Sequence, residues 1–150
     1  MAGYQLDLAG AVGLDTTPLD VPLGGAFGAS WWFGKYDETY ALGRWNSLGV
    51  VGRLETVGDD LRITPMLEFR KGYDLLVLKP WFSIAAGTEL GAARLAPELR
   101  IGTGVKLRRS RFMGVSGRLD GGVALLDGEP VGRFGILLGF DWAAPFKSPQ

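Results

Sequence analysis

Hydrophobic and polar side chains alternate over long stretches of this chain. Residues 94–107 show it most clearly. Their even positions are charged or small (Arg94, Ala96, Glu98, Arg100, Gly102, Gly104, Lys106), and their odd positions are mostly apolar (Leu95, Pro97, Leu99, Ile101, Thr103, Val105, Leu107). A period of two is typical of a β-strand with two different faces. Charge confined to one parity, with glycine beside it, fits the narrow interior of a small barrel whose outside faces lipid.

The same alternation recurs along the chain and predicts eight strands. They run over about residues 4–14, 25–33, 48–56, 61–70, 76–84, 94–107, 113–125 and 133–142. The connections are short, with turn signals at 57–60, 72–74, 108–111 and 127–130 and a longer link at 15–23. Eight strands joined in this way predict an all-β, antiparallel up-and-down meander.

Residues 40–47 fit this scheme less well. They could extend the third strand or form a loop, so the length of the connection before that strand stays open. Arg44 and Asn46 have the parity of the apolar face. If the strand does extend, this mismatch predicts a β-bulge.

Two kinds of barrel share this alternation, and they differ in which face lies inside. A soluble, lipocalin-like barrel would enclose the apolar face and bind a hydrophobic ligand there. A membrane barrel would enclose the charged face, because each Arg or Lys facing mid-bilayer lipid costs about 2–4 kcal/mol. The small residues on the charged face favour the membrane barrel, since glycine weakens a strand exposed to water.

In the membrane barrel the charged side chains form an interior network of paired charges that plugs the lumen. The expected members share one strand face: Asp7, Arg53, Glu55, Arg62, Glu68, Arg70, Lys79, Glu98, Arg100, Lys106, Arg118, Asp120, Arg133 and Asp141. Aromatic residues (Tyr4, Phe33, Tyr36, Tyr40, Phe69, Tyr73, Phe112, Phe140 and Trp142) gather towards one rim when antiparallel strands are counted from the N-terminus, as in a membrane-interface belt.

Composition narrows the chemistry. The 150 residues correspond to one domain, and 16 basic residues balance 16 acidic ones, so nucleic acid is not an expected partner. The chain has no cysteine and no histidine, which excludes disulfides, thiolate metal sites, Ser-His-Asp triads and histidine-bound zinc. We therefore expect no catalytic residue, no metal and no cofactor. There is neither an apolar run long enough for a membrane-spanning helix nor a signal-peptide pattern, so export implies that a signal peptide has been removed from this chain.

Three prolines, Pro65, Pro80 and Pro97, fall on the apolar parity of three consecutive strands. With turns centred near Gly72 and Glu89 they would lie almost abreast. Proline cannot donate a ladder hydrogen bond, so this row predicts a weak seam of bulges or missing bonds, where the membrane could thin or a partner could dock.

The last strand carries a short pattern: polar Arg133, then Gly135, Leu138 and aromatic Phe140. With it the chain resembles the small eight-stranded outer-membrane barrels of the OmpX and OmpA membrane-domain type, in which this pattern is an assembly signal. The resemblance implies a Gram-negative outer membrane, periplasmic termini and recognition by the barrel-assembly machinery. One departure is that residues 141–150 follow Phe140. Either the strand continues to Trp142, giving a barrel over 1–142 and a periplasmic tail over 143–150, or the alignment is off by two residues.

Some barrels of this kind are deacylases that use serine with histidine, and that chemistry does not carry over to a chain without histidine. We therefore expect a non-enzymatic integral barrel that acts as a membrane anchor, a structural protein or an assembly component. Lipid contacts its outer face, and a protein partner could dock on that face or on the periplasmic side. A narrow pore for ions or small solutes and the soluble ligand-binding barrel are the alternatives.

Overall fold

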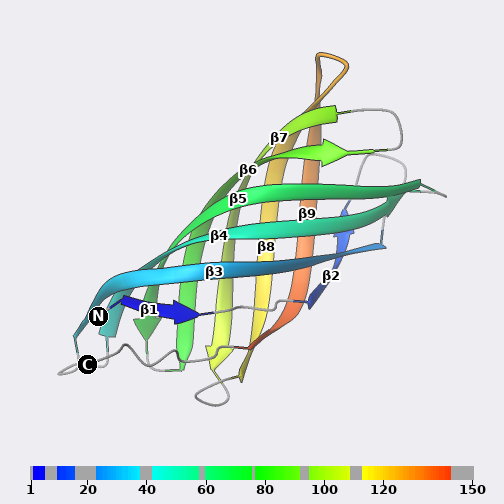
Figure 1. Cartoon of the computed structure of the whole chain (residues 1–150). Helices are drawn as coiled ribbons and strands as arrows, with labels where there is room; N and C mark the ends of the chain where they lie inside the picture. The colour runs from blue at the N-terminus through cyan, green and yellow to red at the C-terminus, as the bar shows by residue number, and fades with distance from the viewer. Residues whose placement is uncertain are drawn as a thin grey trace.

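The computed structural model describes residues 2–5, 10–15, 23–37, 42–57, 60–75, 77–91, 95–108 and 113–142. This part of the chain is almost entirely antiparallel β-sheet (Figure 1). Its strands are β1 (Ala2–Gln5), β2 (Gly10–Asp15), β3 (Leu23–Asp37), β4 (Leu42–Val57), β5 (Asp60–Leu75), β6 (Leu78–Leu90), β7 (Leu95–Arg108), β8 (Met113–Leu126) and β9 (Glu129–Trp142). Within these ranges no helix is long and apolar enough to span a bilayer.

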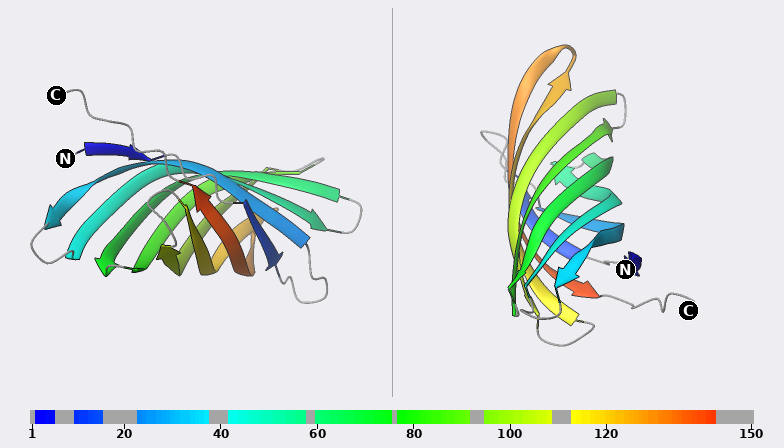
Figure 2. Two further views of the ribbon diagram at one scale, coloured as in Figure 1. Left: turned by 90° about the horizontal axis from the view of Figure 1, so that it is seen from below. Right: turned by 90° about the vertical axis from the view of Figure 1, so that its left-hand side faces the viewer.

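The sheet is a meander, as the sequence predicts. From β3 to β9 each strand pairs antiparallel with the next one along the chain. The predicted first strand corresponds to two segments: β1 pairs with β3, and β2 pairs with both β3 and β9. The sheet is strongly curved, and its strands are inclined to one another (Figure 2).

We call one end of the sheet the Leu75 end. It holds the β5–β6 turn, the start of β4 and the end of β9. We call the opposite end, which holds the β4–β5 and β8–β9 turns, the Asp127 end. In the β8–β9 turn Asp127 and Gly128 both have positive φ, 53° and 86°. Glycine adopts that conformation without steric cost, and such two-residue turns suit the twist of a hairpin.

Several local predictions are wrong. The bulge is absent, because β4 pairs without interruption with β3 and β5 along its whole length. Arg44 lies on the apolar face and is simply exposed there, close to the Leu75 end. The turns expected at 72–74 and near Glu89 are also misplaced: β5 continues to Leu75, which pairs across the turn with Leu78, and β6 continues to Leu90.

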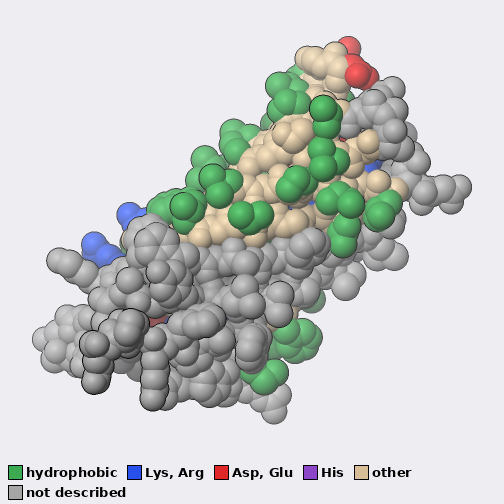
Figure 3. All heavy atoms as spheres, viewed as in Figure 1, with side chains coloured by type: hydrophobic (Ala, Val, Ile, Leu, Met, Phe, Trp, Pro, Cys, Tyr) green, Lys and Arg blue, Asp and Glu red, His purple; other side chains and the backbone are tan. Residues whose placement is uncertain are grey.

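Burial follows the predicted parity. We call the face with Glu98 and Arg100 the inner face, and the face with Leu99, Ile101 and Leu138 the outer face. Arg100 is 1% exposed, whereas Ile101 is 64% and Leu138 69% exposed. Hydrophobic side chains spread over the visible outer surface, with acidic groups at the β8–β9 turn and basic groups near the opposite end (Figure 3). This orientation contradicts the soluble barrel, which needs the apolar face inside.

Glycine makes room for large inner-face residues on neighbouring strands. Trp45 on β4 pairs with Gly72 on β5, Gly72 pairs with Trp81 on β6, and Trp81 pairs with Gly104 on β7. A Cβ on Gly72 would overlap the ring of Trp45, and one on Gly104 would overlap the ring of Trp81. Each indole therefore lies across the glycine of the following strand. This close approach accounts for glycine inside strands, where it otherwise costs stability.

The three prolines do not form one row. Pro97 pairs with Thr88, and the β5–β6 register places Pro65 opposite the same residue. Pro80 lies eight residues before Thr88 on β6 and pairs with Val105 instead. The row fails because β5 continues to Leu75 and β6 to Leu90, so both strands extend past the turns expected near Gly72 and Glu89.

The β5–β6 ladder is nevertheless interrupted near Pro65 and again near Pro80. Its pairs skip from Ile63–Leu90 to Met66–Gly87 and from Gly72–Trp81 to Leu75–Leu78. The register is the same on both sides of each gap, so no residue is inserted. These are interruptions rather than bulges.

Candidate functional site

Charged side chains from β4, β7 and β8 meet at the centre of the inner face. Arg100 on β7 donates from Nε to Glu98 and lies 3.2 Å from a carboxylate oxygen of both Asp120 and Glu55. The side chains of Arg100, Glu98 and Asp120 have no solvent exposure. Three carboxylates surround this one guanidinium, whose donors fan out in a plane and so can serve them all.

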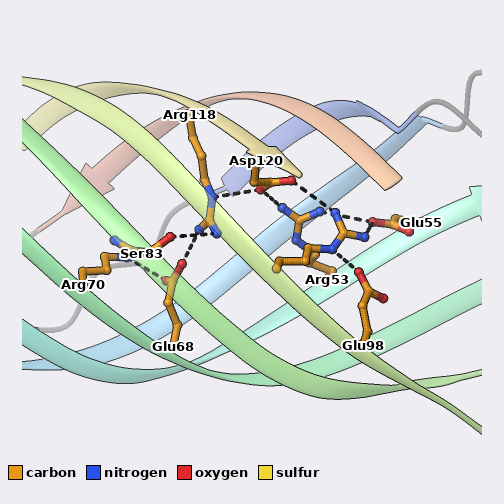
Figure 4. A network of polar contacts seen from close by, with 9 residues as sticks. Arg53, Glu55, Glu68, Arg70, Ser83, Glu98, Arg118 and Asp120 are labelled. Atoms are coloured by element: carbon orange, nitrogen blue, oxygen red, sulfur yellow. Dashed lines mark hydrogen bonds and ion pairs between the residues drawn. The ribbon is translucent and has the colours of Figure 1, made fainter. Parts of the chain in front are cut away.

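Arg53 and Arg133 join the same cluster from the two ends of the strand order β4 to β9. Arg53 on β4 donates to Asp120 on β8, and its Nη1 lies 3.4 Å from Glu55. Arg133 on β9 lies 3.3 Å from Glu55 on β4. Side chains of β4 can contact those of β8 and β9 only if the sheet curves so that its inner face is concave. Figure 4 shows Arg53, Glu55 and Asp120 converging from different strands.

A second group lies nearer the Leu75 end. Arg118 Nη1 lies 2.6 Å from Glu68, and its Nε lies 2.9 Å from Asp120, which links this group to the central one (Figure 4). Arg70 Nε also lies 2.6 Å from Glu68. Both guanidiniums stack near the ring of Trp81, at 4.8 Å for Arg70 and 5.3 Å for Arg118. These cation–π contacts help to compensate the charges for lost hydration.

Two further acids, Glu89 and Asp74, extend the network towards the two ends of the sheet. Glu89 accepts from Arg133 and lies 3.5 Å from Arg62, and Asp74 lies 2.5 Å from Lys79. Neither Asp74 nor Glu89 is among the predicted members, because turns were expected at both positions. Each continues the inner-face parity of its strand, so extending the alternation would have found them.

The remaining expected members are placed as follows. Lys106 lies on the inner face and is partly buried, with its chain across Gly114. Asp7 and the side chain of Asp141 lie outside the described residues. The residues of the expected assembly signal divide between the faces: Arg133 and Gly135 are buried inside, and Leu138 and Phe140 are exposed outside. The strand does continue to Trp142, and residues 143–150 are outside the described part.

The central acids are paired with arginines rather than grouped with one another. In the described part of the chain, no three His, Cys, Asp or Glu side chains are grouped so that they could hold a metal ion. The central carboxylates contact arginines, and their side chains are almost fully buried. A buried ion network of this kind must be almost completely paired, because an unpaired charge in such a place is costly.

Comparison with known proteins places the fold. Neither a protein-family model nor a curated protein sequence matches the chain. A solved structure described as a de novo designed transmembrane β-barrel is similar to it, with a TM-score of 0.59 and 15% identity over 94% of this chain and 96% of that one. The crystal structure of the outer membrane enzyme PagL is similar at a TM-score of 0.61 and 17% identity, over 92% of this chain and 99% of that one. The chain therefore shares the fold of small transmembrane β-barrels.

Proposed function

We propose that this chain is a closed, eight-stranded β-barrel of the Gram-negative outer membrane, with its interior plugged by paired charges. It acts there without catalysis, as a membrane anchor, a structural protein or an assembly component. The distribution of charge carries this proposal: acids and bases are buried on the inner face while large apolar side chains are exposed on the outer face.

Free energy supports the membrane location. Each exposed apolar side chain, such as Phe82, Ile101 or Leu138, gains roughly 1.5–3 kcal/mol when it is fully removed from water. In a bilayer, acyl chains cover all of these side chains at once, so each of them is removed from water. Contiguous exposed apolar surface of this extent is typical of proteins that contact a membrane or another protein.

Strand pairing supports closure. β2 pairs with β9 on one side and β3 on the other, and β3 pairs with β4, so the pairings run round the whole sheet. With β1 and β2 taken as one interrupted strand, this gives eight. A closed sheet leaves no edge with unpaired backbone groups, which lipid could not solvate.

The plug distinguishes this proposal from the narrow pore. Glu98, Arg100 and Asp120 fill the middle of the inner face and have no exposed side-chain surface. Eight-stranded barrels are just wide enough for side chains to fill them. We therefore expect no reproducible conductance steps in planar bilayers, and such steps would favour the pore.

Absence of catalysis rests on composition and packing. The chain has neither histidine nor cysteine, and the central carboxylates are engaged by arginine. PagL is an enzyme, but at 17% identity the likeness concerns fold alone.

A heat-modifiability gel tests the barrel directly. The protein is folded in detergent and run on a gel before and after boiling. A closed barrel migrates differently in the two lanes, and the unboiled form inserts into lipid vesicles and resists protease there. One mobility in both lanes, together with recovery as a stable monomer without detergent, would refute the proposal.

A further inference from the structure

On β4 to β9, the outer face carries charge at one place only. On β4 to β9, the charged side chains whose parity places them outward are Arg44 and Lys71, and both are exposed. The other outward positions of these strands are apolar or uncharged. Both residues are basic, both lie near the Leu75 end, and neither contacts a carboxylate among the described side chains. At the same end of the sheet, the register sets Lys35 of β3 opposite Arg44 and Asp37 of β3 opposite Leu42. We call Arg44, Lys71 and the adjoining Tyr73 the basic corner.

Register brings the three side chains together. Arg44 on β4 pairs with Tyr73 on β5, and Lys71 lies two residues before Tyr73 on the same face. Diagonal neighbours of this kind are about 7–8 Å apart, within reach of long side chains. The Arg44 guanidinium lies 5.9 Å from the centre of the Tyr73 ring, a contact that leaves its N–H groups free to donate. Two cations can therefore contact one anionic group from two sides.

Height along the strand puts the basic corner at a membrane boundary. Ten residues separate Leu61, near the Asp127 end of β5, from Lys71. At about 3.3 Å per residue this is about 33 Å along the strand. A tilt of about 40° reduces it to about 25 Å along the membrane normal, which matches the apolar band of transmembrane barrels. The exposed Leu61, Ile63, Leu67 and Phe69 fill this interval.

Resting on the proposed membrane location, we infer that the basic corner is a binding site for the phosphate of an anionic lipid headgroup. The lipid's acyl chains lie along the apolar outer surface of β4 and β5, and its phosphate lies between Arg44 and Lys71. The surface determines what kind of ligand fits. A ligand that covers the apolar strands and reaches the two basic residues must be apolar over most of its length and negatively charged at one end. Arginine can hold a phosphate through two parallel hydrogen bonds, and lysine adds a point charge. The tyrosine ring suits the headgroup level.

Lipid titration tests the inference on the full chain folded in zwitterionic detergent. Phosphatidylglycerol and phosphatidylcholine with the same acyl chains are added in parallel, and bound lipids are counted by native mass spectrometry. We expect the wild type to prefer phosphatidylglycerol. Each basic residue near an anionic surface contributes an attraction of about 1 kcal/mol, which is about fivefold in affinity. Neutralising one basic residue should therefore reduce the preference about fivefold. The double variant Arg44→Gln/Lys71→Gln should reduce it about 30-fold.

The exchange variant Arg44→Lys/Lys71→Arg is the matched control, because it keeps both charges and should keep most of the preference. Equal binding of both lipids by the wild type, or an unchanged preference in the double variant, overturns the inference. Inorganic phosphate is titrated as a separate arm: if millimolar phosphate displaces the lipid, the site recognises the free anion instead. Heat modifiability is measured on the same samples. A folded, inserting protein without lipid preference refutes only the basic corner, whereas loss of folding or insertion in the wild type refutes the proposed barrel.

Discussion

Replacing Arg100 with methionine should destabilise the barrel more than any single change on its outer face. Arg100 is buried and contacts Glu98, Asp120 and Glu55. Its loss leaves buried carboxylates short of a cation, and removing one partner of a buried ion pair costs about 3–5 kcal/mol. Methionine is flexible and fills most of the space, so the cavity contributes little. We expect the free energy of unfolding to fall by about 4 kcal/mol.

Equilibrium urea unfolding in lipid vesicles, followed by tryptophan fluorescence, measures this change. Leu99→Met is the matched control: it puts the same side chain next along β7 but on the outer face, and we expect it to cost less than about 1 kcal/mol. Glu98→Gln in the Arg100→Met background removes one of the carboxylate charges that Arg100 no longer pairs, and it should restore at least about 1 kcal/mol of the free energy of unfolding. An Arg100→Met variant as stable as Leu99→Met would refute the reasoning that paired charges hold the inner face together.

Three further outcomes follow from the same contacts. Gly104→Ala should lower the free energy of unfolding in urea by about 1–3 kcal/mol, because the new methyl overlaps the Trp81 ring. In the Trp81→Leu background the same change should cost less, and if the two effects simply add, the two residues are not in contact. Amide hydrogen exchange followed by mass spectrometry should be faster around Pro65 and Thr88, where the β5–β6 ladder is interrupted, than in the middle of β7; uniform protection would show that the interruption is not a weak point. Raising NaCl from about 0.05 to about 0.5 M should change the free energy of unfolding by less than about 1 kcal/mol, since buried pairs are screened far less than exposed ones; a larger loss would mean that water reaches the network.

The inner network shows where sequence reasoning succeeds in this fold. Parity alone assigns Arg100 and Glu98 to one face and Leu99 and Ile101 to the other, because successive side chains of a strand point to opposite sides. The energetic cost of charge in lipid then selects the inner side for the charges. Asp74 and Glu89 escaped this reasoning because turn residues nearby suggested that their strands had ended.

Pairing partners could not be predicted in the same way. Arg53 contacts Asp120, 67 residues away along the chain, and Arg133 contacts Glu55, 78 residues away. The register of every intervening strand decides such contacts, and each register depends on where a turn lies. Moving the β5–β6 turn from residues 72–74 to the interval between Leu75 and Leu78 is enough to separate Pro80 from Pro65.

The order of residues along the chain thus determined the antiparallel meander and the direction of each strand face, because both follow from local alternation and short turns. Strand lengths, the partners of each buried arginine and the isolated basic corner were decided only by the folded sheet. They depend on curvature and register, which bring together side chains that no local pattern relates.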